Sequence, residues 1–269
     1  MDVVVEEVSQ VWGGRGGANV VALDRFTHRF RSGRISCILG PSGCGKSTLA
    51  QIVGGIEPAT SGAIRIVDPA APAVNHPLGR DSVMMWQNLN LFPWRSVIDN
   101  VAFGLEMKGV AKAERRVRAR RLIASVGLRG FENHLPGQLS GGMRQRVALA
   151  RALILERPIL LMDEPFAALD AQTKIVMQEE LLRIFDETRK TILFVTHAID
   201  EAILLGDEVV VMTARPGRIK EVIEVALPRP RSLELVATKE FGALFDRAFH
   251  LIREEVMKAM EQQAEAAGA

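Results

Sequence analysis

Hydrophobic and polar positions along this chain follow two patterns, one typical of strands and the other of helices. Short apolar runs bounded by glycine, proline or charged residues predict buried strands, whereas apolar residues spaced three or four positions apart predict amphipathic helices. The predicted strands cover residues 3–8, 20–30, 35–39, 62–67, 83–86, 159–162, 191–196, 208–213 and 217–225. The predicted helices cover residues 48–53, much of 96–157, and then 172–187, 198–205 and most of 232–269.

This order of elements predicts the fold class. Strands that alternate with helices favour an α/β core with a mainly parallel sheet. The first strands precede any helix and predict an N-terminal antiparallel β subdomain, while the helical stretch at about residues 88–157 predicts an inserted helical subdomain. We expect one domain over residues 1–229 and a C-terminal helical extension over residues 230–269, with the boundary at Pro228–Pro230.

The segment between the third strand and the first helix fits the pattern G-x-x-x-x-G-K-[ST] of a loop that binds nucleotide phosphates. Its glycines let successive backbone N–H groups point at one anion, and the N-terminus of the following helix adds partial positive charge. We expect Lys46 to reach the β- and γ-phosphates and Ser47 to hold Mg²⁺. The residues of this loop are Gly40, Pro41, Ser42, Gly43, Cys44, Gly45, Lys46, Ser47 and the adjoining Thr48.

Two acids close the apolar run at residues 159–162. In α/β sheets, the carboxyl ends of the strands are where ligands bind. Asp163 is therefore expected to assist Mg²⁺ coordination through water, and Glu164 to act as the general base on the attacking water. An acidic pair at the end of a strand can also be a solvated turn, and it is the preceding phosphate loop that favours the catalytic interpretation.

The segment Leu139-Ser140-Gly141-Gly142 predicts a helix N-terminus. Ser140 can cap the helix, and the two glycines leave backbone N–H groups open to a phosphate. The alternative is an ordinary Ser-Gly-Gly cap with no ligand.

Composition narrows the class of protein further. The chain has 269 residues, of which 48% are hydrophobic and 25% charged, with a formal net charge of +2. This charge gives no global sign of nucleic-acid binding. The apolar runs are too short for a membrane span, and the N-terminus lacks the features of a secretory signal. The two cysteines favour neither a disulfide scaffold nor a metal site, so we expect a reducing cytoplasm.

Together, these motifs and their order resemble the ATP-binding subunit of ABC transporters, over roughly residues 3–227. The resemblance implies a role for each matching position. Trp12 would stack on adenine, Gln87 would sense Mg²⁺ and the attacking water, and His197 would contact the γ-phosphate. Without this context, a single histidine at a strand end would be expected to bond only to backbone. The ATP of a second subunit would be contacted by Ser140, Gly141 and Gly142. The two subunits would be aligned by Leu169-Asp170.

The resemblance also implies partners. One phosphate loop and one signature segment, Ser140–Gly142, cannot complete a site on a single subunit in this family. The chain would therefore act as a head-to-tail homodimer that ATP closes and hydrolysis reopens. Gln87 would link the site to an integral membrane permease. A permease of this kind works with a periplasmic or lipid-anchored substrate-binding protein. The chain would then lie at the cytoplasmic face of the inner membrane as a peripheral protein.

The segment that follows Gln87 points to a branch of the family. Phe92, Pro93 and Trp94 lie on a loop, where they could receive a short helix of a membrane subunit or simply anchor the loop. The Leu-Phe-Pro-Trp sequence, with residues 213–219 and 228–231, looks like importers of nitrate, sulfonates, taurine and related anions. Relatives that import pyrimidine precursors or bicarbonate share the pattern.

A different class is also possible, namely a soluble ABC ATPase of DNA repair or of regulation, without a transport role. Repair ATPases carry long coiled-coil insertions, whereas only about 50 residues separate Gln87 from Leu139 here. The basic run at residues 114–121 could suggest nucleic acid, but at helical spacing it is more typical of a solvated face. We therefore expect no nucleic-acid partner.

Overall fold

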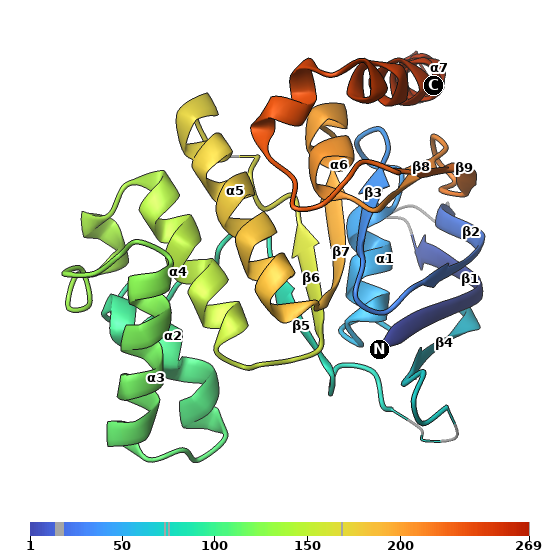
Figure 1. The fold of residues 1–269 in the computed structure, drawn as a ribbon. Helices are drawn as coiled ribbons and strands as arrows, with labels where there is room; N and C mark the ends of the chain where they lie inside the picture. Colours follow the sequence, from blue (N-terminus) through green and yellow to red (C-terminus); the bar gives the residue numbers. More distant parts are fainter. Residues whose placement is uncertain (14–18, 73, 75, 168, 269) are drawn as a thin grey trace.

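A six-stranded sheet forms the centre of the molecule and confirms the predicted α/β class (Figure 1). The computed structural model describes residues 1–13, 19–72, 74, 76–167 and 169–268. The first five strands in the sheet order are parallel, and only the last pairs antiparallel to its neighbour. In that order the strands are β5 (Ser82–Met85), β6 (Ile159–Asp163), β7 (Thr191–Thr196), β3 (Ile35–Leu39), β8 (Glu208–Met212) and β9 (Ile219–Glu224).

The N-terminal antiparallel subdomain is also present, as a three-stranded sheet in which β1 (Asp2–Gly13) lies between β2 (Asn19–Phe30) and β4 (Ser61–Val67). β1 is longer than predicted. Its pairing with β2 shifts register between Val5 and Val8 and again beyond Val8, and Glu7 there has a positive φ of 47°. These irregularities interrupt the alternation of apolar and polar residues, so the pattern ends at Val8 although the strand continues.

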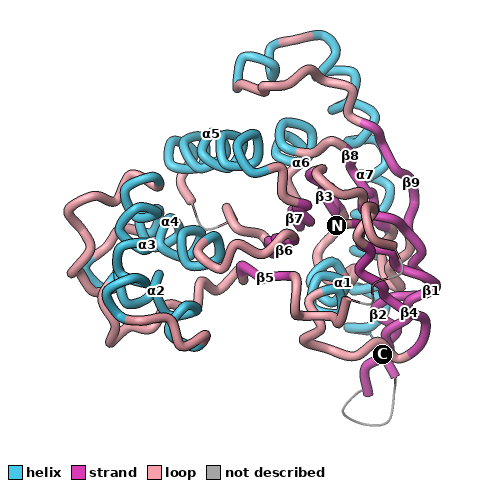
Figure 2. Tube along the Cα trace, turned by 60° about the horizontal axis from the view of Figure 1, so that its bottom comes forward, coloured by secondary structure: helices cyan, strands magenta, loops and turns pink. Residues whose placement is uncertain are grey.

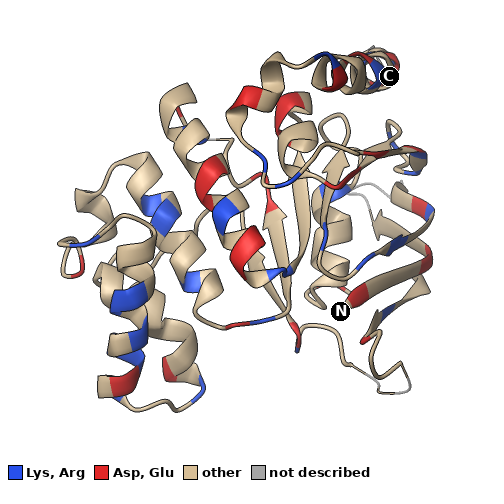
Figure 3. Ribbon diagram, in the orientation of Figure 1, with Lys and Arg blue, Asp and Glu red and all other residues tan. Residues whose placement is uncertain are grey.

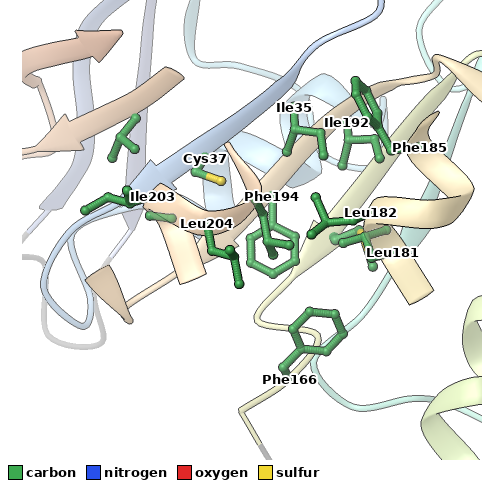
Figure 4. Close-up of a cluster of buried hydrophobic side chains, with 14 of the residues drawn as sticks. Ile35, Cys37, Phe166, Leu181, Leu182, Phe185, Ile192, Phe194, Ile203 and Leu204 are labelled. Carbon is green, nitrogen blue, oxygen red and sulfur yellow. The ribbon is translucent and has the colours of Figure 1, made fainter. Parts of the chain in front are cut away.

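Helices cover both faces of the central sheet, which explains why its inner strands β6, β7, β3 and β8 are buried on both sides. Alternate residues of one strand reach opposite faces: Ile192 and Phe194 pack with α5 (Ala171–Thr188) and α6 (Ile199–Leu205), while Leu193 and Val195 pack with α1 (Lys46–Val53). Figure 2 shows α1 and the α5–α6 pair on opposite sides of the strands. Figure 4 shows the cluster around Phe194 that fills the α5–α6 side.

The middle of the chain forms a separate helical block, made of α2 (Val97–Met107), α3 (Lys112–Ser125), the 3₁₀ turn η1 (Pro136–Gln138) and α4 (Gly141–Leu153). α4 joins this block to the core because it is apolar on two faces. Ala148, Leu149 and Ala152 pack in the central core, whereas Val147 and Ala150 pack against α2 and α3. The N-terminus of α4, which carries Ser140 as its cap, is therefore fixed relative to the sheet.

The basic run at residues 114–121 lies on α3, where Figure 3 shows Lys and Arg along the helix. Several of its arginines pair with acids. Arg116 lies 2.9 Å from Asp99 of α2, and Arg118 lies 2.6 Å from Glu114 one turn earlier. Such local ion pairs are typical of a solvated helix surface.

The C-terminal segment begins with the 3₁₀ turn η2 (Leu233–Ala237) and continues as α7 (Lys239–Gly268). The sequence predicted helix from residue 232, but Thr238 is extended and separates the two parts. Its hydroxyl accepts a hydrogen bond from Phe241 N, which starts α7. α7 packs against α6, β8 and β9. No helix in the described ranges is long and apolar enough to cross a bilayer.

The packing around Phe194 allows a direct prediction of how a substitution there changes the free energy of unfolding. Phe194 is fully buried at the centre of the cluster in Figure 4, whereas Phe249 on α7 is 44% exposed. Phe194→Ala should lower the free energy of unfolding by about 3–5 kcal/mol because it leaves a cavity. The matched control Phe249→Ala should change it by about 0.5 kcal/mol or less. Urea unfolding measures both, and equal shifts for the two variants would contradict the assigned core.

Candidate nucleotide site

The predicted phosphate loop lies between β3 and α1, with all five residues of β3 buried beneath it. Gly45 caps α1 with a φ of 105°, and a Cβ there would lie 2.7 Å from Ala22 O, so only glycine fits. Lys46 is buried, and its Nζ donates to the carbonyls of Gly40 (2.8 Å) and Pro41 (2.9 Å). The lysine therefore lies along the loop, with its charge at the centre of the curled backbone.

Asp163 ends β6 directly beside the loop. Its Oδ1 accepts a hydrogen bond of 2.8 Å from Ser47 Oγ. Burial raises the pKa of Asp163, and the Ser47 hydrogen bond opposes that effect while the nearby Glu164 adds to it. A divalent cation at this position would restore the ordinary preference for the charged carboxylate, because its charge stabilises the anion.

Glu164 has a strained backbone. Its φ is 44°, in the left-handed region that non-glycine residues rarely adopt, which costs on the order of 1–3 kcal/mol. Its N–H donates to Val195 O at 3.0 Å, and this bond holds the residue against the end of β7. Such strain is found most often at functional sites.

Gln87 and His197 both face the carboxylate of Glu164. Gln87 Nε2 lies 3.4 Å from Glu164 Oε2, and His197 Nδ1 lies 3.2 Å from the same oxygen. The three residues follow β5, β6 and β7, which are neighbours in the sheet and run parallel. Their carboxyl ends therefore meet at one edge, where the side chains can act on one ligand.

A cavity of about 380 Å³ lies over the loop. Trp12, near the end of β1, forms one wall and is 38% exposed, so its ring is accessible to a stacking partner. Arg215, from the turn between β8 and β9, forms part of the wall and was not predicted as a site residue. The lining residues are Trp12, Val20, Ala22, Ser42, Gly43, Gly45, Lys46, Ser47, Thr48, Gln87, Glu164 and Arg215.

The signature segment lies away from this cavity, since none of Ser140, Gly141, Gly142 and Asp170 is among its described lining residues. Ser140 caps α4 by accepting from Met143 N, and Asp170 caps α5 by accepting from Thr173 N at 3.0 Å. A Cβ on Gly142 would lie 2.3 Å from Thr173 Cγ2. The starts of α4 and α5 therefore touch, and the two predicted subunit-contact segments form one surface. The neighbouring Ala168 lies outside the described residues.

The donor set at Ser47 and Asp163 fits magnesium. A hydroxyl and a carboxylate oxygen 2.8 Å apart are hard oxygen ligands, which Mg²⁺ prefers. Within the part of the chain that the structure describes, no cluster of three or more His, Cys, Asp or Glu side chains could hold a metal alone. In nucleotide enzymes, one or two protein ligands usually supplement substrate phosphates around Mg²⁺.

Comparison with known proteins shows the family of the chain. The sequence pattern of the family described as "ABC transporter" matches residues 23–167. An uncharacterized ABC transporter ATP-binding protein of Methanocaldococcus jannaschii is 46% identical over 245 residues, covering 91% of this chain and 89% of that protein. The taurine import ATP-binding protein TauB of Rhizobium johnstonii is 47% identical over 215 residues, or 80% of each chain.

Solved structures agree as well. The dimeric structure of the bacterial ABC transporter cassette MJ0796 has a TM-score of 0.73 and 31% identity, and covers 84% of this chain and 100% of that one. The same cassette in a post-hydrolysis state bound to ADP and Pi matches equally well. The chain therefore belongs to the ABC transporter family and is an ATP-binding cassette with ATPase activity.

Proposed function

We propose that this chain is the ATP-hydrolysing subunit of a membrane importer, and that closure and reopening of its dimer drive a permease. The observation that carries the proposal is the position of the Glu164 carboxylate, held between Gln87 and His197 beside the phosphate loop. The 47% identity to TauB supports an import role. With the Leu91–Trp94 segment, it favours small anions such as taurine, other sulfonates or nitrate as cargo.

Each residue of the site then has a chemical role. Glu164 accepts a proton from the attacking water, and the left-handed backbone aims its carboxylate toward the cavity. Gln87 and His197 orient that carboxylate and contact the water and the γ-phosphate. Trp12 stacks on the adenine, which is worth about 1–3 kcal/mol per base. Mg²⁺, held by Ser47 with Gln87 and, through water, Asp163, would supply charge neutralisation for the phosphates.

The site is half of a complete one. Because the cap of α4 and the cap of α5 lie outside the cavity, Ser140–Gly142 and Asp170 would act on the ATP of a second copy. A head-to-tail homodimer places each signature segment on the other subunit's nucleotide. The γ-phosphate then stabilises the closed state, and its loss on hydrolysis removes that differential contact.

A groove between the helical block and the sheet suits a helix from the permease. It has a volume of about 320 Å³ and lies between β5, the following loop, α2 and α4. Phe92 lines it and packs on Phe103 with ring centroids 4.6 Å apart, while Trp94 is 74% exposed beside it. Trp86, adjacent to Gln87, lines the same groove, so a helix bound there would act on the residue that touches Glu164.

A soluble role in DNA repair is less favoured. The residues between Gln87 and Leu139 form the compact α2–α3 pair rather than a projecting coiled coil. We also propose that residues 1–229 form the ATPase domain, that residues about 88–157 form its helical subdomain, and that residues 230–269 form an extension. As an importer subunit the chain would lie on the cytoplasmic face of the inner membrane, next to a permease that receives cargo from a binding protein.

Glu164→Gln should abolish turnover but keep ATP binding, because the amide fills the same space and cannot accept a proton. We expect hydrolysis to fall by about 10²–10⁴-fold. Dimers should accumulate with ATP in size-exclusion chromatography. Glu179→Gln, at an exposed position of α5, is the matched control and should hydrolyse at the wild-type rate. A Glu164→Gln chain with normal turnover would refute its role as base.

Phe92→Ala with Trp94→Ala should uncouple hydrolysis from transport, because the groove loses one aromatic lining residue and the exposed ring beside it while the nucleotide site is untouched. In proteoliposomes that hold the cognate membrane subunits, transport should fall by about tenfold or more, as for loss of interface anchor residues. ATPase activity of the isolated chain should be retained. The control is Phe131→Ala, at an exposed aromatic of the same helical block. Full transport by the double variant would rule out this docking site.

A further inference from the structure

The turn between β8 and β9 contacts the phosphate loop from outside. Arg215, in this turn, donates two hydrogen bonds to the carbonyl of Gly43, from Nε at 3.1 Å and from Nη2 at 3.0 Å. Gly43 is the fourth residue of the loop and has a φ of 76°. The guanidinium thus bonds to a loop carbonyl at a point where the backbone adopts the left-handed conformation.

The turn is held rigidly against β2 as well. Gly217 N donates to Ala22 O at 2.9 Å, and Asp24 N donates to Gly217 O at 3.1 Å. A Cβ on Gly217 would lie 2.1 Å from Cys44 O, so the turn approaches the loop as closely as glycine allows. Arg215 therefore extends from a fixed base rather than from a free surface loop.

The C-terminal helix holds the same turn from the other side. Glu255 of α7 is 1% exposed and accepts from Ala214 N at 2.8 Å and from Lys220 and Lys258. Burial works to raise the pKa of Glu255, but hydrogen bonds from Lys258, Ala214 and Lys220 lower it to about 2. The carboxylate is therefore charged at physiological pH and stays an acceptor for Ala214 N and the two lysines.

Further along α7, Gln262 Nε2 donates to the backbone oxygen of Arg215 at 2.9 Å. A cavity of about 580 Å³ has Ser42, Gly43 and Arg215 on one side and Ala259 and Gln262 of α7 on the other. A continuous set of contacts thus runs from α7 through Arg215 to the phosphate loop.

We propose that Arg215 is a positioning residue for nucleotide binding and that α7 holds it against the phosphate loop. Two charge-assisted bonds keep the loop curled before the nucleotide arrives, and the cation lies at the edge of the same cavity as Lys46. Without Arg215 the loop must be ordered by the nucleotide itself, which lowers affinity for both ATP and ADP. The role concerns binding rather than the water attack, so kcat at saturation is preserved. The proposal for Arg215 rests on the proposed binding of nucleotide by the phosphate loop.

Calorimetric titration of the full-length chain with ADP tests the role directly. Arg215→Ala should weaken binding by about tenfold, as for loss of hydrogen bonds to a charged group. Arg215→Lys keeps the charge and one donor and should recover most of the affinity. Arg253→Ala, at an exposed arginine of α7, is the matched control and should bind like the wild type. Steady-state ATPase measurements should show a raised KM with kcat within about twofold, the pattern of lost uniform binding.

A double-mutant cycle tests the part played by α7. Gln262→Ala should weaken ADP binding by about threefold in the wild-type background, as for one neutral hydrogen bond. It should have no further effect in the Arg215→Ala background, because both changes interrupt the same set of contacts.

Two results would overturn the proposal: wild-type affinity in Arg215→Ala, or an effect of Gln262→Ala that adds fully to that of Arg215→Ala. If Arg215 had a purely structural role, Arg215→Ala would lower the thermal midpoint of the chain without nucleotide and leave the affinity of the folded chain for ADP unchanged. That result would also contradict the proposal. Failure of the unaltered chain to bind ADP would instead refute the nucleotide function, so the two failures are distinguishable.

Discussion

The parallel pairing of β6 with β5 on one side and β7 on the other is the constraint on which the site depends. Because neighbouring parallel strands end at the same edge, this pairing brings Gln87, Glu164 and His197 to one point although they are far apart in sequence. β3 adds the phosphate loop at the same edge, two strands from β6, and the Ser47–Asp163 hydrogen bond joins the two parts. The helices that bury both faces of the sheet hold these strand ends in place.

The helical block and the C-terminal helix extend this centre in different directions. α4 packs with one face in the core and another against α2 and α3, and so fixes its own N-terminus, with Ser140, next to the start of α5. This surface lies outside the nucleotide cavity of its own subunit, which is the geometry expected of a site shared between two copies. α7 lies at the β8–β9 end of the sheet and is connected to the phosphate loop through the β8–β9 turn.

Most of the fold could be predicted from the sequence because the inner strands of the central sheet are short runs that are mainly apolar and have both faces buried. The motif residues at the carboxyl edge of the central sheet could also be found from the sequence, because the phosphate loop, the acidic pair and the histidine each follow a recognisable strand. What the sequence missed depends on close packing between distant segments. The bulges of β1 break the alternation of apolar and polar residues, so the pattern stops at Val8 although the strand continues. Thr238 divides the tail at a point where the helical pattern gave no stop. Arg215 lies within residues 213–219, whose pattern points to a branch of the family but not to a site. The β8–β9 pairing and the contact with Ala22 bring it to Gly43.

The central claim is that one subunit holds half a site, and mixing two inactive variants tests it most directly. Lys46→Ala removes the side chain that is expected to reach the β- and γ-phosphates. Gly141→Asp places a negative charge in the signature segment, where a side chain has open space around it. Alone, each variant should hydrolyse little ATP. Mixed in equal amounts, they should form dimers that combine one intact phosphate loop with one intact signature segment, and phosphate release should rise well above the sum of the separate rates. A mixture that releases phosphate at no more than that sum would contradict the shared site.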